Sequence, residues 1–207
     1  MSAKITSINY CPVKSVSFQS VENCKIKKNI GIIGDRIFAF AKDLDLEQAK
    51  LFEKSPAERK GKWNKVLTLK NSPALNKYNF IFKDEKLTLT FKDNEILSID
   101  INQSTEREAL SNKISELESS LKQPITLMKN DAFPFFDTSI SKKVDFVNSV
   151  SLLNFQSIND FEKKVSKKIE ASIFRGNICI DGLEPWKERE WIGKTIKINN
   201  VLFKVEK

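Results

Sequence analysis

Apolar and polar residues alternate with a period of two through most of the first hundred residues of the chain. This period is typical of strands that bury one face. The alternating runs are Lys4 to Asn9, Val21 to Lys27, Arg36 to Ala41, Lys65 to Leu69, Tyr78 to Phe82, Leu87 to Phe91 and Glu95 to Ile101. Many short strands with this spacing predict a small barrel or sandwich for this half of the chain.

Beyond residue 101 the apolar period changes to that of a helix. Four apolar residues follow at intervals of four, three and four, namely Leu110, Ile114, Leu117 and Leu121. Thr105 and Glu108 have the spacing of a capping box, and Pro124 is a natural stop. The pattern therefore predicts a helix from Thr105 to Lys122 whose apolar stripe packs on a core.

The last third of the chain mixes strand and helix patterns. The expected strands are Ile125 to Met128, Lys143 to Val147, Ile178 to Ile180, Thr195 to Ile198 and Val201 to Val205. Ser149 or Ser151 is expected to begin a short helix. Ser157 and Asp160 are expected to begin another helix that runs to Ile169.

These patterns together predict a mixed α+β fold that is rich in strands. We expect a β-barrel-like domain in residues 1–101 and a connecting helix in residues 102–124. A second β-barrel-like domain with a few helices is expected in residues 125–207.

The composition is that of a soluble globular protein. Of the 207 residues, 40% are hydrophobic and 30% are charged, which are values typical of chains that bury a core. No apolar stretch is long enough for a membrane helix, and residues 1–20 lack the apolar block of a secretory signal. We therefore expect a cytoplasmic protein without a membrane segment.

The net charge of +8 raises the question of nucleic-acid binding. The lysines are spread through every segment of the chain. The densest run has the spacing of a solvated helix face and comprises Lys163, Lys164, Lys167 and Lys168. No recognisable nucleic-acid-binding motif accompanies these lysines, so we expect no nucleic-acid partner.

Histidine is absent, which excludes Ser-His and Cys-His nucleophile pairs and histidine-ligated metals. The three cysteines, Cys11, Cys24 and Cys179, are widely separated and lack the paired spacing of a zinc site or a disulfide framework. Buried, reduced thiols are therefore expected. Cys11 is also considered as a metal ligand because it lies close to the positive charge of Lys14.

Arginine is scarce in this basic chain. Five of the 35 basic residues are arginine, namely Arg36, Arg59, Arg107, Arg175 and Arg189. Arg36 and Arg175 lie where a strand pattern meets a loop pattern, and Lys14 ends the first strand. Guanidinium groups bind phosphate and carboxylate oxygens in pairs, so Lys14, Arg36 and Arg175 are predicted to hold one anionic ligand.

Three motifs surround these cations: Cys-Pro-Val-Lys-Ser at residues 11–15, Gly-Asp-Arg at residues 34–36 and Phe-Arg-Gly-Asn at residues 174–177. In this order they resemble the MOSC family, named for the C-terminal domain of molybdenum cofactor sulfurase, in its form with an N-terminal β-barrel domain. Residues 136–137, 149–152 and 185–191 also fit, so the resemblance spans nearly the whole chain. Cys11 stands where the family has tyrosine.

The resemblance implies that the chain binds the molybdenum cofactor, Mo-molybdopterin. The residues implied to hold this cofactor by its phosphate are Lys14, Ser15, Arg36, Ser149, Ser151, Phe174, Arg175 and Asn177. Asp137 is implied to assist at the metal. The cofactor brings its own dithiolene sulfur ligands, so the absence of histidine does not exclude it.

A structural interpretation of the same residues stays open beside the functional one. In this alternative, Arg36 pairs with Asp35, and Arg175 is a buried bridge that positions its loop. Asn177 holds the same loop through bonds to the backbone, Asp137 is an exposed loop residue, and the serines are helix caps.

Two classes of function follow from the resemblance. The first is an oxidoreductase that reduces N-hydroxylated small molecules, with an electron-transfer protein as partner, or a sulfur-transfer protein of the cofactor. The second is a non-catalytic module that holds a phosphorylated pterin. Family members similar to the mitochondrial amidoxime-reducing component carry a molybdenum-binding cysteine after the strand matched by Val201 to Val205, whereas this chain stops at Lys207. The second class is therefore expected for the chain as given.

Overall fold

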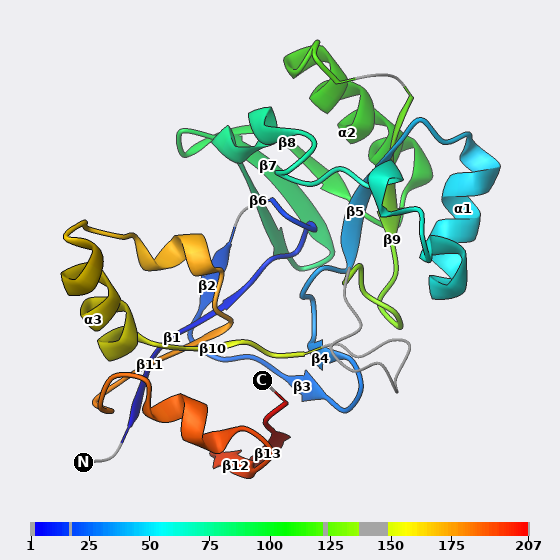
Figure 1. Cartoon of the computed structure of the whole chain (residues 1–207). Coiled ribbons are helices and arrows are strands. Elements are labelled where there is room, and N and C mark those ends of the chain that lie inside the picture. Colours follow the sequence, from blue (N-terminus) through cyan, green and yellow to red (C-terminus); the bar gives the residue numbers. More distant parts are fainter. Residues whose placement is uncertain (1–2, 17, 122–123, 137–148, 207) are drawn as a thin grey trace. The chain divides into compact units, whose positions relative to one another are not determined.

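The computed structural model describes residues 3–16, 18–121, 124–136 and 149–206 (Figure 1). The fold is mixed α+β and strand-rich, as the sequence predicts. The described strands pair into five sheets of two to four strands each, and the barrel form expected of each half stays a prediction. No helix among the described residues is long and apolar enough to cross a membrane.

Two compact units divide the chain, and each combines separate stretches of the sequence. Unit 1 contains the described residues of Met1–Asn9, Ser20–Ile32 and Ser139–Lys207. Unit 2 contains the described residues of Tyr10–Gln19 and Ile33–Thr138. The first strand of the chain pairs with a strand of the last third, so unit 1 includes both.

An antiparallel meander forms the largest sheet of unit 2. Its strands are β6 (Tyr78–Lys83), β7 (Lys86–Phe91) and β8 (Asn94–Asp100). Buried Tyr78 and Phe80 alternate with exposed Asn79 and Ile81, so the period of two seen in the sequence marks the buried face.

The second sheet of unit 2 pairs β5 (Phe38–Lys42) with β9 (Ile125–Lys129) in antiparallel register. Residues 38–41 of β5 are all buried, because one face packs in the larger core cluster and the other in a smaller one. Helix α2 (Ser104–Leu117) lies against β9 (Figure 1). Helix α1 (Leu46–Lys54) buries Ala49 and Phe52 in the smaller cluster.

Unit 1 is built on a four-stranded sheet. In spatial order its strands are β10 (Leu152–Asn154), β11 (Ile178–Asp181), β1 (Lys4–Tyr10) and β2 (Gln19–Val21). Helix α3 (Phe155–Val165) leads from β10 toward the parallel strand β11, as a parallel pair requires a crossover (Figure 1).

Short elements complete the two units. Unit 1 has two further strand pairs: β3 (Ile26–Lys27) with β4 (Gly31–Ile32), and β12 (Thr195–Ile198) with β13 (Val201–Lys204). The 3-10 helices of unit 1 are η4 (Ala171–Phe174) and η5 (Lys187–Trp191). Those of unit 2 are η1 (Pro56–Arg59), η2 (Trp63–Lys65) and η3 (Pro73–Lys77).

Several predicted elements are wrong in detail. Residues 65–69 form no strand. Lys65 is the last residue of η2, and Val66 makes only an isolated bridge, to Ala41. No helix begins at Ser149 or Ser151, since β10 follows them and α3 begins at Phe155. The strand expected at residues 143–147 lies outside the described residues.

The predicted connecting helix is present as α2 but packs within unit 2, and its capping box is absent. Gln103 occupies the N-cap position without a side-chain bond. Glu106, rather than Glu108, accepts the backbone N–H of Asp100 at 2.6 Å. The helix ends at Leu117 because the next residue, Glu118, leaves the helical conformation and turns its side chain into a buried contact with Tyr78.

Candidate functional site

The predicted cofactor-binding residues fall into two groups, one in each unit. The unit 2 group comprises Lys14, Ser15 and Arg36. The unit 1 group comprises Ser149, Ser151, Phe174, Arg175 and Asn177. Asp137 lies outside the described residues.

In unit 2 the backbone holds Lys14 and Arg36 on two neighbouring segments. Residues 11–14 run beside residues 36–38, with a parallel bridge between Val13 and Phe38. The Arg36 N–H donates to the Cys11 carbonyl at 2.6 Å, and the Lys14 N–H donates to the Phe38 carbonyl at 2.8 Å. The two motifs around Lys14 and Arg36 are thus brought together by main-chain hydrogen bonds.

Lys14 is almost fully enclosed for a lysine, with 3% of its surface exposed. Its ammonium nitrogen lies 5.0 Å from the centroid of the Trp63 ring, which is the geometry of a cation–π contact. A cation in such a place is poorly hydrated, so an anion that reaches it would meet less competition from water.

Arg36 makes the ion pair with Asp35 that the structural interpretation expects. Asp35 is 1% exposed and also accepts the Cys11 N–H at 2.8 Å, so it fixes the turn as well as the guanidinium. The guanidinium carbon lies 4.8 Å from the centroid of the Phe136 ring. In this pair the guanidinium nitrogen Nη1 donates to the Asp35 carboxylate, and a guanidinium group carries five N–H donors in all.

The Gly-Asp-Arg turn depends on its glycine. Gly34 has a φ of +93°, and a Cβ at this position would lie 3.2 Å from the Tyr10 ring. Only glycine adopts such a φ at little cost, and the close approach of the ring adds a steric reason.

Three of the eight candidate residues have left-handed backbone conformations. The φ angles are 63° at Ser15, 54° at Arg36 and 52° at Arg175. Residues other than glycine, asparagine and aspartate seldom adopt this region, and such conformations cluster at ligand-binding positions. Both arginines that the motifs single out share this feature.

In unit 1 a buried amide joins the two loops that carry the candidates. Asn177 is 1% exposed, and its Oδ1 accepts from the Ser151 hydroxyl at 2.9 Å and from the Ser151 N–H at 3.1 Å. The Asn177 Nδ2 donates to the Asn9 carbonyl at 3.0 Å. Asn177 and Ser151 therefore position the loop that precedes β11, as the structural interpretation proposed for Asn177.

Arg175 follows the last residue of η4, where its N–H donates to the Ser172 carbonyl at 3.0 Å. The neighbouring Phe174 is 44% exposed, so it is a surface residue rather than a core one. A Cβ on Gly176 would lie 2.8 Å from the Leu153 Cβ, which explains the glycine of this motif. Neither Ser149 nor Ser151 caps a helix, since Asn154 caps α3 by accepting the Gln156 N–H at 3.1 Å.

Cys11 does not fit the role of a metal ligand. It is fully buried, and its Sγ lies 2.7 Å from the Val13 carbonyl oxygen and 2.9 Å from that of Val16. These contacts are those of a thiol that donates within a turn. Among the described residues, no three histidine, cysteine, aspartate or glutamate side chains gather as a metal site.

Sequence reasoning missed two of the five arginines. Arg59 is 2% exposed and donates to the carbonyls of Phe52, Glu53, Phe133 and Pro134 at 2.6, 3.3, 2.7 and 3.3 Å. Burial lowers the pKa of Arg59 to about 10, although the charge of Glu53 opposes this effect. Arg107 binds Glu53 at 2.8 Å. The signal in the sequence that could have pointed to Arg59 and Arg107 was the scarcity of arginine, which applied equally to all five arginines.

Comparison with known protein families finds no family that matches this sequence, and comparison with curated proteins finds no match either. The resemblance to the MOSC family therefore stays a prediction that rests on the motifs themselves.

Proposed function

We propose that this protein binds a phosphorylated pterin, the pyranopterin of the molybdenum cofactor, and recognises it through the phosphate. The observation that carries the proposal is the left-handed backbone shared by Ser15, Arg36 and Arg175. Left-handed backbone also occurs in turns of this chain, as at Asp84 and Glu85, but it costs free energy at residues as large as arginine and clusters at ligand-binding positions.

The chemistry of the side chains supports a phosphate in particular. Arg36 donates to Asp35 through one guanidinium nitrogen, Nη1, and a guanidinium fork matches two phosphate oxygens. Lys14 adds a poorly hydrated point charge. In unit 1, Ser151 and Asn177 hold the backbone on which Arg175 is presented.

Of the two classes of function, we propose the non-catalytic binding module. The oxidoreductase is the alternative. A bound molybdenum cofactor supplies dithiolene sulfurs and the redox chemistry, while the protein binds and orients it. Cys11 does not fit a thiolate ligand, so no step is assigned to it. Amidoxime reduction by cofactor-loaded protein with an electron donor would distinguish a reductase from a binding module.

We predict that Arg175→Lys weakens the binding of a phosphorylated pterin by about 1.5–3 kcal/mol, because lysine keeps the charge but loses the fork. The measurement is isothermal titration with a stable oxidised pterin that carries its phosphate. Arg36→Lys should weaken binding for the same reason.

Two controls make this test specific. Arg189→Lys changes an exposed arginine of unit 1 outside the candidate group and should leave affinity unchanged. The second control is the same pterin without its phosphate. This dephosphorylated pterin should bind wild type and Arg175→Lys with equally low affinity. Equal affinity of wild type and both motif variants would refute the proposal.

A further inference from the structure

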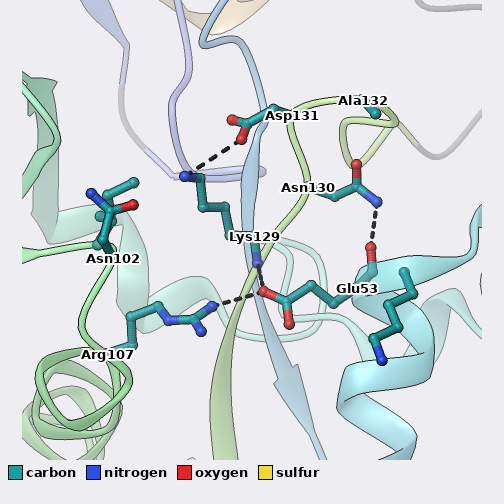
Figure 2. Close-up of a pocket in the computed structure, with 9 residues that line it drawn as sticks. Glu53, Asn102, Arg107, Lys129, Asn130, Asp131 and Ala132 are labelled. Carbon is teal, nitrogen blue, oxygen red and sulfur yellow. Dashed lines mark hydrogen bonds and ion pairs between the residues drawn. The ribbon is translucent and has the colours of Figure 1, made fainter.

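An open depression of about 500 Å³ lies in unit 2, apart from the motifs discussed above. It is formed where α1 ends, where α2 begins and where β9 ends, and its volume is in the range of small-molecule sites. The residues that line it are Glu53, Lys54, Ile101, Asn102, Arg107, Lys129, Asn130, Asp131 and Ala132 (Figure 2).

Glu53 organises this depression. One carboxylate oxygen, Oε1, accepts from Arg107 Nη1 at 2.8 Å and from the Lys129 backbone N–H at 2.8 Å. The Glu53 carbonyl accepts from the Asn130 side-chain amide. Figure 2 shows Arg107 reaching from α2 toward Glu53 at the end of α1. The carboxylate therefore fixes the position of the guanidinium.

Arg107 has donors that this arrangement does not use. Its Nε is shielded from solvent and has no hydrogen-bond partner among the described residues. Nε and Nη2 share one edge of the planar guanidinium, away from the Nη1 that Glu53 occupies. A buried donor without an acceptor is unfavourable, and an oxyanion on this edge would satisfy two N–H groups at once.

Lys129 is the second incompletely satisfied cation. Its ammonium lies 3.4 Å from Asp131 and 4.0 Å from Glu85, and these carboxylates are 65% and 63% exposed. Charge-assisted hydrogen bonds are shorter than this, and exposed ion pairs of such length contribute little. The Lys129 side chain itself is 21% exposed, so a closer anion would be a better partner than either carboxylate.

We propose that this depression binds a small molecule through a carboxylate or phosphate group, which takes the free edge of Arg107 and the ammonium of Lys129. Asn102 adds an amide group for the rest of the ligand, whereas the Asn130 amide is held by its bonds to the Glu53 carbonyl and the Phe133 N–H. The proposal is independent of the pterin-binding function, because none of its residues belongs to the candidate groups described above.

The test is an NMR titration of the whole chain with two probes, inorganic phosphate and succinate. Saturable shifts of the backbone amides of Lys129 and Asn130 are expected with one or both probes, and the probe that binds more tightly identifies the oxyanion. Lys129→Gln should raise the dissociation constant roughly tenfold while leaving the backbone bond to Glu53 in place. Arg107→Lys should do the same by removing the fork.

The matched control is Lys113→Gln, which removes one positive charge from α2 at a residue that does not line the depression. It should leave the dissociation constant within about twofold of wild type, since this ammonium is paired with Glu116 and does not line the depression. Absence of saturable shifts with either probe would overturn the proposal. An equal loss of affinity in Lys113→Gln and Lys129→Gln would also overturn it, because the binding would then be general attraction to a basic surface.

Discussion

At the scale of single residues, the arginines show how differently one side chain is used. Arg59 is enclosed and bonded to backbone carbonyls, with its guanidinium carbon 4.0 Å from the centroid of the Phe135 ring. Arg36 pairs with a buried aspartate, and Arg107 has a buried nitrogen that finds no hydrogen-bond partner among the described residues. Arg59 therefore has a structural role, because every described contact of its guanidinium joins one part of unit 2 to another.

We predict that Arg59→Lys destabilises the protein by about 3 kcal/mol or more. Lysine keeps the buried charge but cannot reach carbonyls on both sides, and hydrogen bonds that involve charged groups are worth roughly 1.5–3 kcal/mol each. Urea unfolding of wild type and variant measures the difference. Arg189→Lys, at an exposed position, should change stability by less than about 0.5 kcal/mol.

Glu118 is a residue whose ionisation is coupled to folding. Burial raises its pKa, but hydrogen bonds from Lys77 at 2.5 Å and Tyr78 at 2.7 Å, with the Lys77 charge, outweigh burial and hold the pKa below its ordinary value. The unfolded chain therefore binds a proton more readily than the folded one. Ionised Glu118 therefore stabilises the folded protein. This stabilisation is fully present above the ordinary glutamate pKa of about 4.3 and is lost as pH falls through the lower pKa of the folded state.

We therefore predict that Glu118→Gln removes part of the acid sensitivity of the fold. The free energy of unfolding, measured from pH 7 down to pH 3, should fall less steeply in the variant than in wild type. Glu116→Gln, on an exposed residue at the end of α2, is the control and should follow wild type. Parallel curves for wild type and Glu118→Gln would contradict the assignment.

At the scale of elements, the β6–β7 hairpin shows a conflict between its sequence and its turn. Two residues, Asp84 and Glu85, connect the paired ends Lys83 and Lys86. Both have positive φ angles, 50° and 58°, which define the type I′ turn that suits a twisted hairpin. Asparagine followed by glycine is the preferred sequence for this turn, so glutamate at the second position carries strain.

Replacement of Asp84-Glu85 by Asn-Gly is predicted to stabilise the protein by about 0.5–1 kcal/mol, because the new residues adopt positive φ more easily. Thermal unfolding would show an increase in the melting temperature. The lost Glu85–Lys129 contact is 4.0 Å long and exposed, so it offsets little of the gain. A decrease in stability would show that the turn differs from the type assigned.

At the scale of the whole molecule, the units are built from interleaved stretches of sequence. β1 pairs with β11, which lies 170 or more residues later, with Lys4 opposite Asp181 and Ile8 opposite Ile178. The chain between them supplies all of unit 2. Pairing over such a separation leaves no local pattern in the sequence, which is why a division into consecutive domains was expected instead.

The sequence by itself determined the mixed α+β class, the existence of the strands β6, β7, β8, β12 and β13, and the presence of α2. These elements have strong local periods, and a period of two or 3.6 follows directly from backbone geometry. Two motifs of the sequence contain Gly34 and Gly176, where a Cβ would lie 3.2 Å from the Tyr10 ring and 2.8 Å from the Leu153 Cβ. Helix α1 was missed, although Asp45 caps it by accepting the Gln48 N–H at 2.7 Å, because its exposed Leu46 and Leu51 weaken the apolar stripe.

The tertiary structure alone decided the surroundings of Lys14 and Arg59. Nothing in the sequence around Lys14 predicts a cation–π contact with Trp63, and nothing around Arg59 predicts bonds to the carbonyls of residues 133 and 134. Such contacts join segments that the chain separates by tens of residues. They depend on how whole elements pack, since the direction and burial of a side chain are set by neighbours that are distant in sequence.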